Sequence, residues 1–152
     1  MKPVCLVIGA GAGIGGTVGK RFAKEGYHTV LCRRSDERGL KKLVSDIEDE
    51  GDDATGFLLN AVEEGVLEDR VSMVENEIGP IEVVLFNLGA QIGNRSLADT
   101  SFKAFELGWR MACFALFRVA KAVVPAMESR GSGTILVTSA TAAIRGNAGQ
   151  HS

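Results

Sequence analysis

A glycine-rich segment near the start of the chain has the composition of a phosphate-binding loop. It reads Gly9-Ala10-Gly11-Ala12-Gly13-Ile14-Gly15 and follows an apolar run at residues 4–8. Glycines let the backbone turn tightly and approach a pyrophosphate, whose charge is met by free amides and by the positive end of the next helix. The segment therefore predicts a dinucleotide-binding loop rather than a merely structural turn. The residues expected at the cofactor are Gly9, Gly11, Ala12, Gly13, Ile14 and Gly15.

The end of the second apolar run indicates which dinucleotide is preferred. Cys32-Arg33-Arg34 stands there, at the place where an acidic side chain would bind the ribose 2′-hydroxyl of NAD. A guanidinium suits a phosphate instead, because it can donate two parallel hydrogen bonds. Arg33 and Arg34 therefore predict NADP(H) as the cofactor. The alternative is that they are two solvated arginines at a strand end.

The elements that must position these residues alternate along the chain. Apolar runs typical of buried strands occur at 4–8, 29–32, 54–59, 81–86 and 134–137. Helical periodicity separates them at about 14–26, 36–51, 63–78 and 102–127. This alternation predicts an α/β fold, a Rossmann-type doubly wound parallel sheet in three αβα layers with strand order 3-2-1-4-5. Residues 1–152 are expected to form a single dinucleotide-binding domain.

Several of these segments resemble motifs of the classical short-chain dehydrogenases/reductases. Residues 9–15 resemble the TGxxxGIG motif of that family, with Ile8 in place of the threonine, and residues 86–89 resemble its NNAG motif. Residues 133–143 are similar to its fifth strand and serine turn, so the resemblance covers essentially the whole chain. It implies that the adenine contacts Asn60 and Ala61. It also implies that the wall of the cofactor site consists of Asn87, Leu88 and Gly89.

The resemblance further implies a reaction, hydride transfer between a nicotinamide and a carbonyl or alcohol substrate. In the family a tyrosine of a Tyr-x-x-x-Lys motif acts as acid/base, and that motif is expected at or just past Ser152. The chain is thus expected to be truncated before its catalytic segment and to be inactive alone. The only tyrosine, Tyr27, precedes the second strand and is no candidate.

The other positions of the family's proton relay are altered in this sequence. The family's serine falls on Ala140, which leaves Ser139, one residue earlier, as the catalytic candidate, and Thr141 as a possible substitute. The helix asparagine falls on Ala112. His151 lies near the expected tyrosine, but a lone histidine there is more simply a solvated side chain.

Two other functions are compatible with these residues. A noncatalytic NADP(H)-binding sensor or interaction module would keep the glycine loop while Ala112 and Ala140 abolish the relay. An extended-type relative acting on nucleotide sugars is the third possibility, and the glycine spacing disfavours it.

Composition excludes several classes of partner. A net charge of -2, with 24% charged residues and no basic cluster, predicts no nucleic-acid binding. Residues 4–8 are too short to span a membrane and resemble no secretory signal, so a cytoplasmic location without membrane association is expected. Cys5, Cys32 and Cys113 are widely spaced and lie in apolar runs, which predicts reduced, packed thiols. They and the two histidines lack zinc-ligand spacing, so no metal site is expected.

The predicted helix from Phe102 to Met127 is apolar nearly all round. Such a helix must be covered on several sides, and one sheet cannot do this. Its cover is expected from further chain or from a second subunit. The second possibility predicts a homo-oligomer formed through this helix, and self-association of the chain.

Overall fold

The computed structural model describes residues 1–89 and 96–146 and contains one five-stranded sheet. The strands are β1 (Val4–Ile8), β2 (His28–Arg33), β3 (Ala54–Leu58), β4 (Ile81–Phe86) and β5 (Thr134–Val137). Every neighbouring pair is parallel, in the order β3-β2-β1-β4-β5. This confirms the predicted order, in which the winding reverses between β1 and β4 and leaves a ligand crevice at their carboxyl ends.

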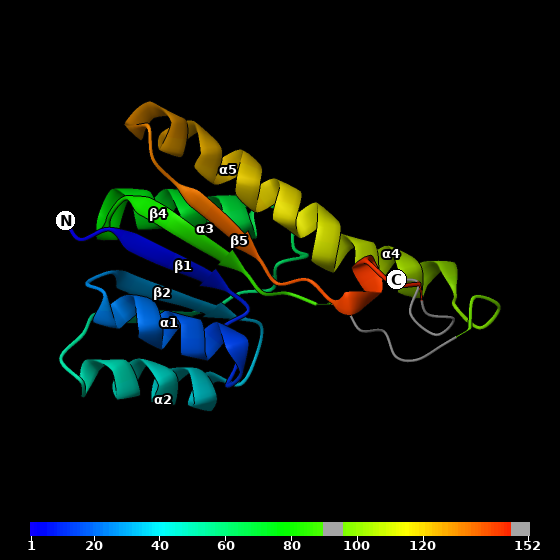
Figure 1. The fold of residues 1–152 in the computed structure, drawn as a ribbon, viewed down its shortest axis with the longest axis horizontal. Coiled ribbons are helices and arrows are strands. Elements are labelled where there is room, and N and C mark those ends of the chain that lie inside the picture. Colours follow the sequence, from blue (N-terminus) through cyan, green and yellow to red (C-terminus); the bar gives the residue numbers. More distant parts are fainter. Residues whose placement is uncertain (90–95, 147–152) are drawn as a thin grey trace.

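Helices cover both faces of the sheet, so the predicted three layers are confirmed (Figure 1). One face carries α1 (Ile14–Lys24) and α2 (Glu37–Glu48), and the other carries α3 (Val66–Met73) and α5 (Ala115–Arg130). The preceding helix, α4 (Phe102–Trp109), extends beyond the end of the sheet (Figure 1).

Alternate residues of β1 belong to two separate cores. Val4, Leu6 and Ile8 pack toward α3 and α5, whereas Cys5 and Val7 pack toward α1 and α2. Successive side chains of a strand point to opposite faces, and all five residues of β1 are buried. The continuous apolar sequence of this strand is therefore required by helices on both sides.

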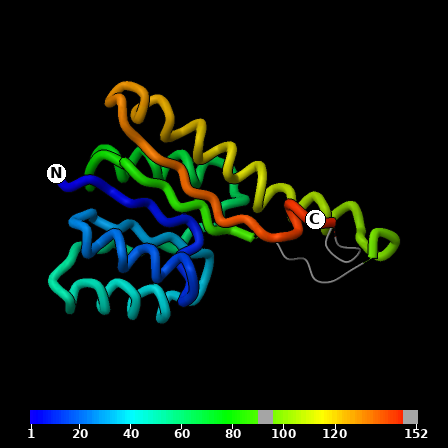
Figure 2. Tube along the Cα trace, viewed as in Figure 1, coloured from blue at the N-terminus to red at the C-terminus, as the bar shows by residue number. Residues whose placement is uncertain are grey.

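Two helices differ from their predicted bounds. The helix expected from Glu63 begins at Val66, because Gly65 adopts φ 80° and the Glu63 amide closes a turn on the Asn60 carbonyl. It ends in a π-helical turn (Val74–Ile78). The long helix also contains a π turn (Arg110–Phe114) between α4 and α5, and it stops at Gly131, where φ is 70°. The three parts form one continuous rod (Figure 2).

The prediction of packed thiols holds for two of the three cysteines. Cys5 and Cys32 are buried in the sheet, and burial raises the pKa of each thiol to about 12. Cys113 is exposed, so the prediction was wrong there, because its π turn lies beyond the sheet that would cover it. Within the described residues no helix is long and apolar enough to cross a bilayer.

Candidate functional site

Two glycines hold the glycine-rich loop against the end of β4. Gly9 has φ +98°, and a Cβ atom there would lie 2.5 Å from the Asn87 carbonyl oxygen. A Cβ atom at Gly15 would collide with the Gly9 carbonyl. At both glycines, the space that a side chain would take is filled by backbone atoms. A side chain at either position would separate the loop from the sheet.

The outer glycines of the same loop face open space. A Cβ atom at Gly11 or Gly13 would have no neighbour within 4 Å, and Ala12 and Ile14 are exposed. The next helix, α1, has no side-chain cap at Gly13 and no acidic residue in its first turn. Its positive end therefore faces open space without a capping or acidic side chain, an arrangement that fits the pyrophosphate of a dinucleotide.

Asn87 fixes this loop from the neighbouring strand. Its side-chain amide donates to the Gly9 carbonyl at 2.9 Å, and its backbone amide donates to the Ile8 carbonyl at 2.8 Å. Of the two residues that follow, Leu88 lines the small cavity near Arg33, and Gly89 is exposed. Asn87 thus joins β4 to the loop, a positioning contact that sequence motifs alone do not reveal.

Residues expected at the adenine meet at the carboxyl end of β2. A small cavity of about 30 Å³ is lined by Gly9, Arg33, Arg34, Asn60, Ala61 and Leu88, together with Ile8, Cys32, Leu59, Val62 and Met111. The Leu59 amide donates to the Arg33 carbonyl at 2.9 Å and thereby joins the two strand ends. The side-chain amide of Asn60 donates to Glu63 at 3.1 Å.

A second hollow, of about 290 Å³, opens between the glycine loop and α2. Its lining consists of Gly11, Ala12, Gly16, Thr17, Lys20, Arg33, Asp36, Gly39, Lys42, Leu43 and Asp46. The acids in it are paired with the bases, Asp36 with Arg33 at 3.1 Å and Asp46 with Lys20 and Lys42 at 2.9 and 2.7 Å. Hydrogen bonds from both lysines lower the pKa of Asp46 and keep it charged.

Sequence reasoning missed the members of this hollow other than the loop residues and Arg33. Lys20 lies on α1, whereas Asp36, Lys42 and Asp46 lie at or along α2. The spacing of Lys42 and Asp46, one helical turn apart, indicates a pair on one face of the helix. Nothing in the sequence indicates that Lys20, 26 residues earlier in the chain, joins them.

The catalytic candidates follow β5 at the same edge of the sheet. The Thr138 amide donates to the Phe86 carbonyl at 3.0 Å, so the next residue, Ser139, lies near the end of β4 and is exposed. Thr141 begins a short 3-10 turn (Thr141–Ala143). Ala112 lies within the π turn of the long helix. His151 falls outside the described residues.

Tyr27 lies far from the glycine loop, and the described residues contain no group of metal ligands. Tyr27 precedes β2, at the edge of the sheet opposite the glycine loop, and its ring packs edge-on against Phe22 with centroids 5.2 Å apart. Residues 1–89 and 96–146 contain no group of three His, Cys, Asp or Glu side chains that could hold a metal ion.

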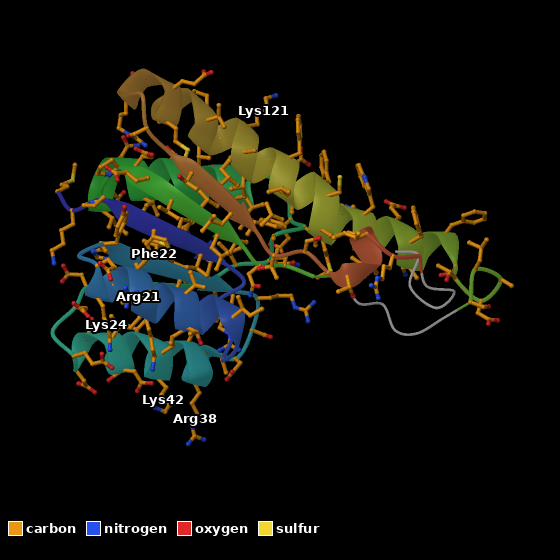
Figure 3. The ribbon with its side chains drawn as sticks, viewed as in Figure 1. Arg21, Phe22, Lys24, Arg38, Lys42 and Lys121 are labelled. Atoms are coloured by element: carbon orange, nitrogen blue, oxygen red, sulfur yellow. The ribbon has the colours of Figure 1, made fainter. Side chains whose placement is uncertain are left out.

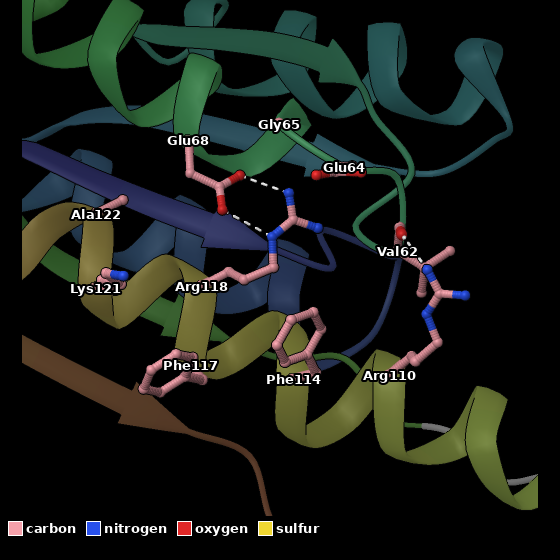
Figure 4. Close-up of a pocket in the computed structure, with 10 residues that line it drawn as sticks. All are labelled: Val62, Glu64, Gly65, Glu68, Arg110, Phe114, Phe117, Arg118, Lys121 and Ala122. Carbon is pink, nitrogen blue, oxygen red and sulfur yellow. Dashed lines mark hydrogen bonds and ion pairs between the residues drawn. The ribbon is translucent and has the colours of Figure 1, made fainter.

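A third hollow shares only Val62 with the small cavity near Asn60. It measures about 800 Å³ and lies between α3 and the long helix, lined by Val62, Glu64, Gly65, Glu68, Arg110, Phe114, Phe117, Arg118, Lys121 and Ala122 (Figure 4). Arg118 is buried there and donates to both carboxylate oxygens of Glu68, at 2.7 and 2.6 Å. This ion pair lowers the pKa of Glu68 and joins α5 to α3, which indicates a structural role.

Comparison with known proteins agrees with this geometry. Residues 3–152 match the short chain dehydrogenase family. A dehydrogenase/reductase SDR family member 4 from Sus scrofa is 29% identical over 143 residues, which are 92% of this chain and 50% of that protein. A short-chain dehydrogenase from Rhodopseudomonas palustris has a TM-score of 0.90 at 35% identity, covering 97% of this chain and 68% of that one.

Two further structures of similar fold were solved with different dinucleotides. An actinorhodin polyketide ketoreductase with NADPH has a TM-score of 0.88 at 29% identity, covering 97% of this chain and 57% of that one. An NAD+-bound xylitol dehydrogenase has a TM-score of 0.88 at 26% identity, covering 97% and 56%. The chain spans about half the length of the curated relatives it matches. By its sequence motifs, its sheet order and these matches, the chain belongs to the short-chain dehydrogenase family.

Proposed function

We propose that this chain is the cofactor-binding part of an NADP(H)-dependent oxidoreductase. The observation that carries the proposal is the position of Arg33, which ends β2 and lines both the small cavity near Asn60 and the hollow beside the glycine loop. A phosphate on the adenosine ribose would lie between these two spaces. A guanidinium there favours NADP(H) over NAD(H).

Each part of the site has a separate task in this proposal. The open backbone at Gly11 and Gly13 and the positive end of α1 bind the pyrophosphate, while Asn87 holds the loop in place. Arg33 and Arg34 bind the 2′-phosphate. When bound, the nicotinamide supplies a hydride acceptor or donor for a carbonyl or alcohol substrate. Ser139, at the same edge of the sheet, would hydrogen-bond the substrate oxygen.

Proton transfer is the task for which residues 1–89 and 96–146 offer no tyrosine at this edge. Its single tyrosine lies at the opposite edge of the sheet. We therefore propose that residues 1–152 act as one dinucleotide-binding domain that binds the cofactor without turnover.

Calorimetric titration with NADPH and NADH tests the proposal. Arg33→Met is compared with Arg38→Met, which removes the same charge from an exposed side chain that projects from α2 away from the sheet (Figure 3). We expect Arg33→Met to weaken NADPH binding by at least roughly tenfold, since a charge-assisted contact contributes about 1.5–3 kcal/mol. NADH binding and the Arg38→Met variant should change little. Failure of the unmodified chain to bind either dinucleotide would overturn the proposal.

A noncatalytic NADP(H)-binding sensor is the second candidate, and the two alanines at relay positions favour it. Ala112 lies within the π turn of the long helix, and Ala140 precedes the turn that begins at Thr141. π turns frequently mark functional sites, yet a methyl group cannot relay a proton. The codons that follow Ser152 in the gene discriminate the two functions, because a Tyr-x-x-x-Lys motif there supports an enzyme and its absence supports a sensor.

We further propose that the chain forms a homo-oligomer through its long helix. Large apolar side chains of α4 and its continuation are exposed in the described structure, among them Phe102 at 97% and Phe117 at 60%. Trp109 and Phe114 stack on each other with ring centroids 5.2 Å apart, which gives this surface a flat aromatic area. Exposed apolar patches of this kind mark interaction sites, and a second copy of the helix has the same apolar face.

A further inference from the structure

Asp36 forms an ion pair with Arg33, whose guanidinium would bind a 2′-phosphate in the proposed function. Its Oδ2 atom lies 3.1 Å from Nη2 of Arg33, in the hollow beside the glycine loop. The Arg33 side chain is only 20% exposed, whereas that of Asp36 is 56% exposed. The acid is therefore the more exposed partner of the pair, in a hollow that both residues line.

The position of Asp36 is fixed by more than this ion pair. It caps α2, with Oδ1 accepting a hydrogen bond from the Gly39 amide at 3.0 Å. Its backbone has φ 63°, and it is the one non-glycine residue with positive φ in the described part of the chain. The two carboxylate oxygens thus have separate partners, the start of the helix and the guanidinium.

Gly39 leaves the space in which this pair lies. A Cβ atom at residue 39 would come within 2.8 Å of Nη1 of Arg33 and even closer to Oδ2 of Asp36. Glycine in a helix costs about 0.5–1 kcal/mol relative to alanine. Its presence in the first turn of α2 is explained by the ion pair packed against it.

The two remaining bases of the hollow share one acid. Lys20 and Lys42 both bind Asp46, so the hollow holds three bases and two acids. A phosphate entering it meets cations that already have partners. Asp36 is the acid that pairs with Arg33, and Arg33 is the base that lines both the small cavity and this hollow.

We propose that Asp36 is a specificity-determining residue that limits the preference for NADPH over NADH by competing with the 2′-phosphate for Arg33. This inference rests on the proposed function. A phosphate must share or displace the carboxylate and is repelled by its charge, whereas a 2′-hydroxyl is uncharged and meets no such repulsion.

Asp36→Asn removes the negative charge of residue 36 but keeps a side chain that can cap α2. Asparagine also accepts the Gly39 hydrogen bond and tolerates the left-handed backbone, so α2 keeps its start. Glu37→Gln is the matched control, because Glu37 is the adjacent residue and pairs with Lys41 rather than Arg33. Dissociation constants for NADPH and NADH are measured by calorimetry for the unmodified chain, both variants, Arg33→Met and the Asp36→Asn/Arg33→Met double variant.

We expect Asp36→Asn to tighten NADPH binding by roughly 3- to 5-fold, the effect of a partly exposed ion pair. NADH binding should change by less than about 2-fold, and Glu37→Gln should leave both constants unchanged. In the Arg33→Met background most of the gain should disappear, because no guanidinium is left to compete for and only the direct repulsion by the carboxylate remains.

Other outcomes separate the two proposals. If Asp36→Asn weakens NADPH binding, or changes NADPH and NADH in parallel, Asp36 positions Arg33 or α2 and the inference is wrong while the proposed function stands. A gain of undiminished size in the Arg33→Met background also overturns it. If the unmodified chain binds neither dinucleotide, the proposed function fails and the inference fails with it.

Discussion

The β1-α1-β2 unit and the α4-α5 helix with β5 differ in how completely the chain covers them. All five residues of β1 are buried between two helical layers. In β5 three of four residues are exposed, and the preceding helix exposes several aromatic side chains. The first unit is covered on both faces of the sheet by helices of the described chain. The second has apolar surface that residues 1–89 and 96–146 do not cover.

The two regions should therefore differ in how they respond to amino-acid substitutions. In the glycine loop the tightest contacts are between backbone atoms, so single substitutions should be costly. On the long helix several large apolar side chains are exposed in the described structure, so substitutions of these should change association more than folding. The following predictions test that contrast, from the largest expected effect to the smallest.

Gly9→Ala should have the largest effect on stability. Its methyl group would lie 2.5 Å from the Asn87 carbonyl oxygen, and its φ of +98° is strained for any L side chain. We expect a loss of about 3 kcal/mol or more in the free energy of unfolding, measured by denaturant titration. Gly11→Ala is the control, because a Cβ atom there has open space. Equal stability of the two variants would contradict the packing described for the loop.

Phe117→Lys should weaken self-association by at least about tenfold if the long helix is the interface, since it places a charge in an apolar contact. Sedimentation equilibrium measures the change. Leu58→Lys is the control, because Leu58 is also a partly exposed apolar residue but ends β3 at the far edge of the sheet. A monomeric unmodified chain would contradict the proposed oligomer.

Glu68→Gln should destabilise the chain by about 1 kcal/mol at neutral pH, because it breaks the ion pair that joins α3 and α5. The folded-state pKa of Glu68 is lowered from 4.5, so this contribution is present above pH 4.5 and is lost as the pH falls through the lower folded-state value. Denaturant titrations across pH measure it. Glu64→Gln is the control, because Glu64 lines the same hollow, and it should lower the stability at neutral pH by less than Glu68→Gln does.

Cys113→Ser should change stability by less than about 0.5 kcal/mol, since the residue is exposed. It should nevertheless remove the one rapidly alkylated thiol. Cys5 and Cys32 are buried with pKa values of about 12, so they should react only when the chain unfolds. Mass spectrometry after a short iodoacetamide pulse counts the modified thiols. Rapid labelling at Cys5 in the folded chain would show that the sheet opens locally.

Much of the fold could be predicted because its signals are local. The apolar runs, the glycines and the helix stops each depend on a few adjacent residues, and they placed β1, β4 and β5 at their observed bounds. The start of α3 was missed by three residues, because Gly65 and the turn on Asn60 override helical periodicity. The exposure of Cys113 was missed because an apolar sequence does not show whether its neighbours are in the same chain.

The sequence by itself determined the parallel sheet, its strand order and the glycine loop, since strand and helix patterns with short connections allow few arrangements. Only the tertiary structure decided which charges meet. It joined Lys20 to Asp46 across 26 residues and Arg118 to Glu68 across 50, and it placed Asn87 on Gly9 across 78. Such contacts depend on how separate elements pack, and periodicity within one element contains no information about them.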